Sequence, residues 1–275
     1  MSNNEPPNDP SESTMEDVEV PVDSDLHIAD QYMSLGKALK LKGDYASAIQ
    51  EMSKALDIRR RVVGKDHPDT ASAYYQLGIC HTQAKNYDEA LTELKRALTL
   101  GRICWGKTHE DTGCTYYQLG IVLNAKEEYD LGLRELRKAA SIFENILGDD
   151  HEATARTYHH IGDALVGKND SIGGLVQYAR AFAIQVAQLG RQNPQTMETF
   201  RKLDLHMRKS EDWNHFWVWE GKAQKNESIR HWMKGQRDGF LCPVLYFFMS
   251  NQKARYLWFN CLFVSVEVEI VTHGL

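Results

Sequence analysis

The 275-residue sequence has few cysteines and few prolines, and residues 1–36 contain no lysine or arginine. The five cysteines form no CxxC pair and no spacing typical of a disulfide framework, so we expect reduced thiols in a cytoplasmic protein. Only seven prolines occur in this length, which favours helices. The sequence opens MSNNEPPNDPSESTMEDVEV, without a basic segment or an apolar core, and no secretory signal is predicted.

Motifs of common enzymes and of nucleic-acid-binding proteins are also missing. There is no GxSxG, no phosphate-binding glycine loop and no HExxH, since HEDT and HEAT lack the second histidine. No basic stripe with interleaved aromatic residues would attract a nucleic acid. Cys114 has no base placed beside it in the sequence, which makes it a poor candidate nucleophile. We therefore expect a protein that is not an enzyme, has no nucleic-acid partner and needs no metal or other cofactor.

A repeat of 42 residues organises the segment 24–212. The stretches YMSLGKAL, YYQLGICH, YYQLGIVL and YHHIGDAL begin at residues 32, 74, 116 and 158. The second halves of the units align at the same interval, beginning with GDYASAIQ, KNYDEALT, EEYDLGLR and NDSIGGLV. Self-similarity at such a period is typical of a solenoid. The predicted units are about 24–64, 66–106, 108–148 and 150–190, followed by a capping helix at 193–212. The acidic segment 1–23 before them is predicted to be a disordered tail, because it is polar and contains proline.

Each unit has the periodicity of two helices. Tyr74, Leu77 and His81 lie on one face of a predicted first helix, and Tyr87, Leu91 and Leu94 begin an apolar stripe on a second. Small residues recur where two helices must approach closely, because a large side chain there would leave voids. They are Gly36, Gly78, Gly120 and Gly162 in the first helices, and Ala48, Ala90, Gly132 and Gly174 in the second.

The pattern Tyr-x-x-Leu-Gly, followed by Gly/Asn-Tyr and two alanines, resembles the tetratricopeptide repeat. The 42-residue period and the GKxHPDT-like linker are similar to the kinesin light chain variety of this repeat, whose second helix is about two turns longer. The resemblance implies an all-α fold, a right-handed superhelix (α-solenoid) of four helix pairs plus a capping helix, with a non-repeat C-terminal tail.

The linkers between units repeat a histidine among acidic residues, as GKDHPDT, GKTHEDT and GDDHEAT, with GRQNPQT as a fainter echo. A histidine near carboxylates can bind a metal or act as a base, and the same residues can mark the start of a helix. Successive repeats are stacked about 10 Å apart, so the three histidines cannot share one ion. We therefore predict helix boundaries, with N-caps at the preceding residues Ser24, Asp66, Thr108 and Asp150. The linker glycines are expected to end the second helices in left-handed caps, at Gly64, Gly106, Gly148 and Gly190.

The adjacent histidines His159 and His160 could be taken for a catalytic pair. Neighbouring residues on a helix point about 100° apart, so only one of them is expected to face any given site. The prediction is one packing histidine and one surface histidine.

In tetratricopeptide folds the first helices line a concave surface that receives an extended or helical peptide, so the resemblance implies a peptide-binding groove. Tyr75 with Ile79, and Tyr117 with Ile121, repeat one apolar pair at the 42-residue interval, which is typical of a surface that binds apolar anchors. The alternative is that neighbouring side chains cover these residues. The predicted groove residues are Met33, Lys37, Lys40, Ser72, Tyr75, Ile79, Thr82, Cys114, Tyr117, Ile121, Asn124, Arg156, His159 and Asp163.

Residues 213–275 have a different composition and hold five of the six tryptophans. Two apolar runs, 239–249 and 256–271, are both shorter than the roughly 18–20 residues of a membrane span. Three hypotheses stay open for this aromatic-rich segment: packing on the last repeat, contact with a membrane interface, or a poorly ordered tail.

The sequence thus predicts a non-enzymatic scaffold or adaptor, kinesin light chain-like, that binds a peptide or partner protein in the groove of the repeats. It is expected in the cytoplasm, without a membrane partner. The alternative function is a membrane-associated assembly factor anchored through the aromatic C-terminal segment.

Overall fold

The structure, a computed structural model, describes residues 22–209. The predictions for the acidic tail, from residue 1 to 21, and for the aromatic-rich segment lie outside the described residues. The membrane hypothesis for that segment therefore stays a prediction. Within 22–209, no helix is both long enough and apolar enough to cross a membrane.

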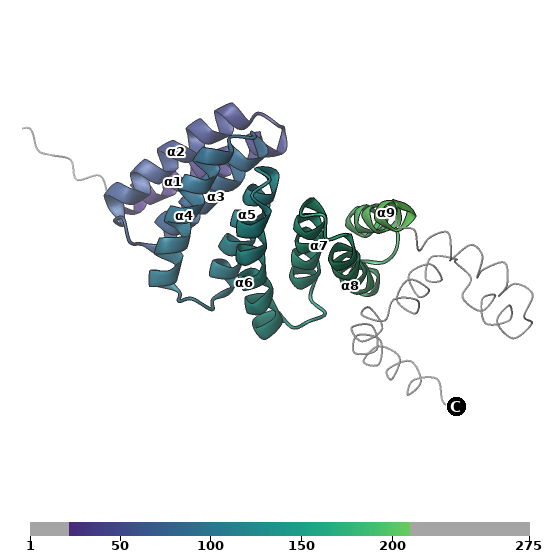
Figure 1. The fold of residues 1–275 in the computed structure, drawn as a ribbon. Coiled ribbons are helices and arrows are strands. Elements are labelled where there is room, and N and C mark those ends of the chain that lie inside the picture. The colour runs from purple at the N-terminus through teal and green to yellow at the C-terminus, as the bar shows by residue number, and fades with distance from the viewer. Residues whose placement is uncertain (1–21, 210–275) are drawn as a thin grey trace, which may run out of the picture.

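The described part of the chain consists of nine helices and contains no strand, which confirms the predicted all-α fold of four helix pairs and a capping helix. The pairs follow one another in a single row from α1 to α9 (Figure 1). The helices are α1 Val22–Leu41, α2 Tyr45–Val62, α3 Pro68–Gln83, α4 Tyr87–Cys104, α5 Glu110–Ala125, α6 Tyr129–Leu147, α7 Glu152–Gly167, α8 Ser171–Leu189 and α9 Pro194–Lys209.

The small residues predicted between the helices of each pair lie at close contacts. A Cβ atom on Gly120 would lie 2.4 Å from Cγ of Leu136, and one on Gly78 would lie 2.6 Å from Cγ of Leu94. Both leucines are fully buried. The absence of a side chain at these glycines therefore sets how closely the two helices of a unit pack.

Each pair is also joined by a cation over a tyrosine ring. A basic residue of the second helix lies 4.5–5.7 Å from the ring centroid of a tyrosine on the first helix, an attractive arrangement for a cation over an aromatic face. The four contacts are Lys54 with Tyr32, Arg96 with Tyr74, Lys138 with Tyr116, and Arg180 with Tyr158. This contact recurs at the 42-residue interval, so each unit repeats the same internal packing.

The linker histidines are themselves the N-caps of α3, α5 and α7. Nδ1 of His67, His109 and His151 accepts a hydrogen bond from the backbone N–H two residues further on, each over 3.2 Å. In α9 the equivalent residue is Asn193, whose Oδ1 accepts from the N–H of Gln195 at 2.9 Å. Nδ1 of histidine is as many bonds from Cα as Oδ1 of asparagine, so the imidazole can replace the usual cap.

The N-caps predicted from the sequence were therefore wrong. Asp66, Thr108 and Asp150 each precede the capping histidine by one residue. Helix α1 begins at Val22, inside the segment predicted to be a tail, so Ser24 lies within the helix and does not cap it.

A threonine closes each of these linkers. The hydroxyl groups of Thr70, Thr112 and Thr154 donate to the carbonyl oxygens of Gly64, Gly106 and Gly148 at 2.8–2.9 Å. The three threonines are fully buried, which makes this hydrogen bond an internal part of each junction.

The linker glycines have positive φ, from 81° to 100°, as the predicted left-handed caps require. However, ψ is 162° at Gly148 and 163° at Gly190, so these two residues adopt a backbone conformation that is essentially limited to glycine and is not left-handed helical. Helices α2 and α4 end one residue earlier, with Val63 and Trp105 as C-caps. The chain thus leaves α6 and α8 through a backbone conformation that other residues rarely adopt.

Candidate functional site

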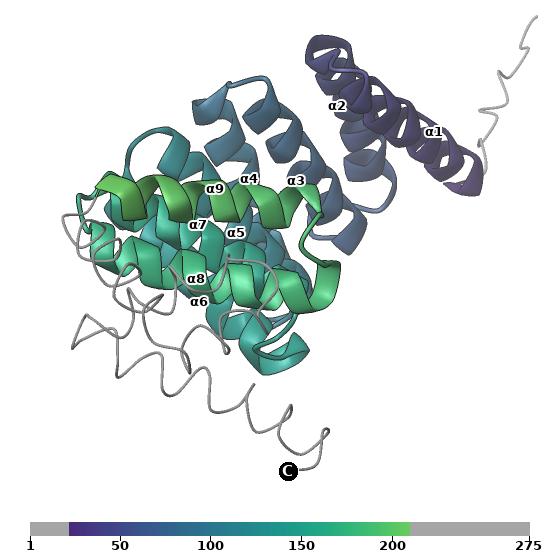
Figure 2. The same ribbon diagram turned by 90° about the vertical axis from the view of Figure 1, so that its right-hand side faces the viewer.

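The first helices α3, α5 and α7 contact one another in sequence along one side of the row. Figure 2 views the row from its α9 end, with α7, α5 and α3 following behind. We call the surface that α1, α3, α5, α7 and α9 present the first-helix face. The predicted groove residues all belong to these helices.

The repeat position of Tyr75 and Tyr117 lies between consecutive first helices. The side chain of Gln118 on α5 lies close to the hydroxyl of Tyr75 on α3. Tyr117 of α5 makes an edge contact with the ring of His160 of α7, with centroids 5.5 Å apart. Burial raises the pKa of Tyr117 to about 12, which is consistent with a hydroxyl that water reaches poorly. These tyrosines act mainly as wedges between repeats.

Met33 and His159 occupy the same repeat position and are buried, 4% and 8% exposed. Met33 belongs to the core cluster around Tyr74 and Leu77. The prediction that Met33 and His159 face an open groove was therefore wrong, and Tyr75 and Tyr117 are only partly exposed. The periodicity of one helix identifies its faces, but it does not reveal that the next first helix covers this one.

Other predicted groove residues make hydrogen bonds within the repeats or are partly buried there. The hydroxyl of Thr82 donates to the carbonyl oxygen of Gly78 in its own helix at 2.7 Å. Nδ2 of Asn124 donates to the carbonyl oxygen of His160 at 3.0 Å, which joins α5 to α7. Cys114 is partly buried, and burial raises the pKa of its thiol to about 11, so it is a poor nucleophile near neutral pH.

The remaining predicted residues reach solvent on the first-helix face. Lys37, Ser72 and Arg156 are exposed, and Lys40, Ile79 and Ile121 are partly exposed. Arg156 Nε lies 3.6 Å from Oε1 of Glu152 one turn earlier in α7. The sequence reasoning missed Gln76 and Gln118, which are partly exposed and share the repeat position of His160. The recurrence of these residues at the 42-residue interval was the sequence signal that could have identified them.

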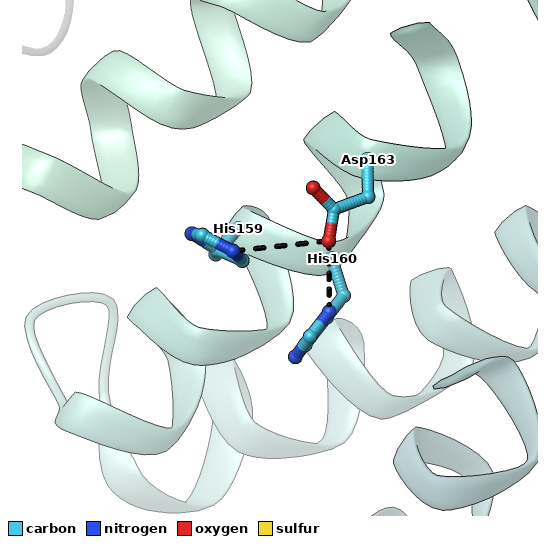
Figure 3. A group of neighbouring side chains, drawn as sticks. All are labelled: His159, His160 and Asp163. Carbon is cyan, nitrogen blue, oxygen red and sulfur yellow. Dashed lines mark hydrogen bonds and ion pairs between the residues drawn. The ribbon is translucent and has the colours of Figure 1, made fainter. Parts of the chain in front are cut away.

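A polar cluster lies on α7 around Asp163. Oδ1 of Asp163 accepts from the hydroxyl of Tyr178 at 2.7 Å and from Nζ of Lys202 at 2.5 Å. Its Oδ2 lies 3.1 Å from Nδ1 of His160 and 3.7 Å from Nε2 of His159 (Figure 3). Asp163 therefore gathers groups from α7, α8 and α9 at one end of the first-helix face.

The charges in this cluster determine the protonation states. Burial alone would raise the pKa of Asp163, but the hydrogen bond from His160 and the nearby charges of both histidines and Lys202 outweigh burial and lower it. Burial lowers the pKa of His159 to about 4, against the opposing effect of Asp163. At neutral pH the carboxyl group is ionised and the His159 imidazole is neutral.

The sequence prediction that only one of the two adjacent histidines could face a given site was wrong. His160 and Asp163 are three residues apart and His159 and Asp163 are four apart, and both spacings bring side chains together on a helix. Both imidazoles consequently reach the same carboxylate oxygen.

A sequence model described as the tetratricopeptide repeat matches residues 28–102 and 111–171. The chain is a tetratricopeptide repeat protein. No curated protein matches its sequence.

Several solved structures have the same fold at low sequence identity. A putative kinesin light chain with nearly identical TPR-like repeats from Podosopora anserina is 14% identical, with a TM-score of 0.58 over 78% of this chain and 98% of that one. BtubC from P. vanneervenii is 16% identical, with a TM-score of 0.52 over 79% and 94%. The apo form of RapI is 13% identical, with a TM-score of 0.57 over 84% of both chains. These structures, the first of them described as a putative kinesin light chain, share the fold of this chain. Tetratricopeptide repeats generally mediate protein–protein interaction, which supports a role as an interaction scaffold.

Proposed function

We propose that this protein is a non-enzymatic scaffold that binds a peptide segment of a partner protein in a concave groove on its first-helix face. Ile79 and Ile121 support this proposal most directly. They share one repeat position on α3 and α5, and both are partly exposed. The neighbouring Tyr75 and Tyr117, in contrast, pack between consecutive repeats. Apolar side chains recurring on an otherwise polar surface are favourable anchor points for a ligand.

The charges at the α1 end favour an acidic group on the ligand. Lys37 is exposed and Lys40 partly exposed, and neither has an ion-pair partner among residues 22–209. Lys37 also shares the repeat position of Ile79 and Ile121, so a ligand that follows the row would pass from apolar to basic contacts. The proposed ligand therefore carries apolar anchors and an acidic residue on the side that approaches α1.

The repeat spacing constrains where the anchors lie in the ligand. Successive repeats are about 10 Å apart, and an extended peptide rises about 3.3 Å per residue. Two apolar anchors about three residues apart in an extended segment would therefore reach Ile79 and Ile121. In a helical segment the same separation needs about seven residues, at 1.5 Å each.

A peptide-display selection on the full chain tests the proposal. The selected peptides are measured by calorimetry against Ile79→Ala/Ile121→Ala and against a matched double variant, Ile103→Ala/Ile146→Ala. The control isoleucines are 67% and 48% exposed on the second helices α4 and α6. We expect the first variant to bind at least about tenfold more weakly, since each truncated anchor loses on the order of 1 kcal/mol of burial. Equal affinities of the two double variants for every selected peptide would refute the groove.

We also propose a cytoplasmic location, which rests on the cysteine usage of the sequence. The proposed activity needs no cofactor, because the ligand is held by side-chain contacts alone.

A further inference from the structure

The polar cluster on α7 contains three atoms that can ligate a metal ion. One ring nitrogen of His159, one ring nitrogen of His160 and a carboxylate oxygen of Asp163 all lie within 4.8 Å of one another. Figure 3 shows both imidazole rings turned toward the same oxygen of Asp163. The described residues 22–209 contain no other group of three such side chains.

The surroundings of His159 permit the tautomer that metal binding requires. Its Nδ1 lies 2.7 Å from the hydroxyl oxygen of Thr199, which can accept a hydrogen bond from Nδ1–H while it donates to the carbonyl oxygen of Gln195 at 3.1 Å. In this tautomer Nε2 has a lone pair and lies 3.7 Å from Oδ2 of Asp163.

Nε2 of His159 and Oδ2 of Asp163 are too far apart for a hydrogen bond. A cation between them would be attracted by the carboxylate and by the lone pair of Nε2. Metal-binding histidines usually donate their second ring N–H to a neighbouring group, which fixes the ring and its tautomer, and Thr199 occupies that place here.

Two of the three ligand separations fit a small divalent ion. Zn²⁺ binds histidine nitrogen and carboxylate oxygen at about 2.0–2.2 Å in tetrahedral geometry, which places neighbouring ligand atoms about 3.3–3.5 Å apart. The carboxylate oxygen lies 3.1 Å from the His160 nitrogen and 3.7 Å from the His159 nitrogen, so the observed values bracket this range. Two imidazoles and one carboxylate are ligands that favour zinc and similar transition metals over magnesium or calcium.

Oδ1 of Asp163 is engaged by groups other than the two histidines. Tyr178 and Lys202 both donate to Oδ1, which orients the carboxylate and leaves Oδ2 for the ion. The side chains of His160 and Asp163 are 27% and 23% exposed, so the ion could be reached from solvent on their side.

We propose that His159 Nε2, His160 Nδ1 and Asp163 Oδ2 bind one Zn²⁺ ion, or a similar divalent transition-metal ion, with a fourth coordination position left open. This site does not depend on the proposed peptide groove. His160 binds the ion with Nδ1 deprotonated and its proton on Nε2, so a proton leaves the His160–Asp163 hydrogen bond when the metal enters.

The test is a titration of the full chain, produced without a histidine tag and stripped of metal by a chelator that is then dialysed away. Zn²⁺ binding is measured by calorimetry, and Co²⁺ is titrated in parallel because its visible spectrum reports the coordination geometry. We expect one ion at this site with a dissociation constant on the order of 1 μM.

Three variants assign the binding to this cluster. His160→Ala removes a partly exposed ligand and should weaken binding more than about 100-fold, whereas Thr199→Val removes only the group that fixes His159 and should weaken it about 10–100-fold. His27→Ala removes an exposed histidine of α1, which interacts with Gln31, and should leave the affinity unchanged. Circular dichroism checks that each variant is folded.

Metal held elsewhere in the chain would persist in His160→Ala, so the difference from the unmodified chain isolates the proposed site. The proposal is overturned if the unmodified chain binds no Zn²⁺ at about 100 μM, or if His160→Ala binds as tightly. Unchanged affinity in Thr199→Val would overturn the proposed role of Thr199 in fixing the His159 ring. If His160→Ala fails to fold, Thr199→Val and the tetrahedral Co²⁺ spectrum still decide the outcome.

Discussion

Replacing a capping histidine by alanine should destabilise the solenoid, and His151 is the most informative position. Its Nδ1 accepts the N–H of Ala153 at 3.2 Å. His67 and His109 make the same bond, but each also lies 3.5 Å from a carboxylate oxygen, of Asp69 or Asp111. At His151 the residue two positions on is an alanine, so this substitution isolates the cap from that ion pair.

The expected magnitude follows from the exposure of the bond. Loss of an N-cap costs about 0.5–2 kcal/mol. The capping histidines are largely solvent-accessible, with side-chain exposures of 41% for His67 and 46% for His109, so water can replace part of the lost hydrogen bond. We therefore expect His151→Ala to lower the free energy of unfolding by about 0.5–1 kcal/mol. The triple alanine variant at His67, His109 and His151 should lose about 1.5–3 kcal/mol if the three caps act independently.

Urea denaturation followed by circular dichroism measures the effect, and asparagine provides the control. Asn193 already caps α9 in the same place, so His151→Asn should keep the full stability or gain slightly. Because repeat proteins can unfold in more than one step, the whole curve is compared rather than one midpoint. If His151→Asn is destabilised as much as His151→Ala, the imidazole stabilises the linker by ring packing and the capping argument fails.

Three further predictions concern other parts of the solenoid. Gly120→Ala should lower the free energy of unfolding by about 1–3 kcal/mol, because the new Cβ would overlap the buried Leu136; a stability within error of the unmodified chain in urea would contradict this. Alkylation of Cys114, followed by mass spectrometry, should be slow at pH 8 and rise about tenfold per pH unit toward its pKa of about 11, since only the thiolate reacts; a plateau below pH 9 would contradict the burial effect. A double-mutant cycle on Lys126 and Asp88, which form an ion pair 2.5 Å long between repeats, should give a weak favourable coupling that falls in high salt, because the Asp88 side chain is 84% exposed; a coupling unaffected by salt would contradict this.

The repeat itself could be predicted from the sequence because the same packing problem recurs every 42 residues. Gly120 and its equivalents mark the closest approach inside a pair, and their spacing alone predicts four pairs. The capping role of histidine was missed because N-cap statistics favour serine, threonine, aspartate and asparagine. Asn193, which stands in the fourth linker where the others have histidine, was the clue that identifies the capping position.

The first-helix face was harder to predict, because its exposure depends on the angle between units rather than on any one helix. Tyr75 and Tyr117 have the sequence pattern of a binding surface, yet the next first helix covers much of each ring. The polar cluster at Asp163 needs Lys202 and Thr199, which lie about 40 residues away on α9. No local pattern shows that these side chains meet.

The repeated linker has a consequence for how such a chain can change over evolutionary time. Each of the first three junctions combines a glycine with positive φ, a capping histidine and a threonine that bonds back to the glycine. A chain cut after Gly64 and rejoined at Lys107 would read GKTHEDT across the new joint and keep all three residues in register. Helix α5 would then follow α2 in place of α3, with the glycines and tyrosines of its contact surface at equivalent positions. A gene encoding this protein could therefore lose or gain whole 42-residue units by recombination while every remaining junction keeps its hydrogen bonds.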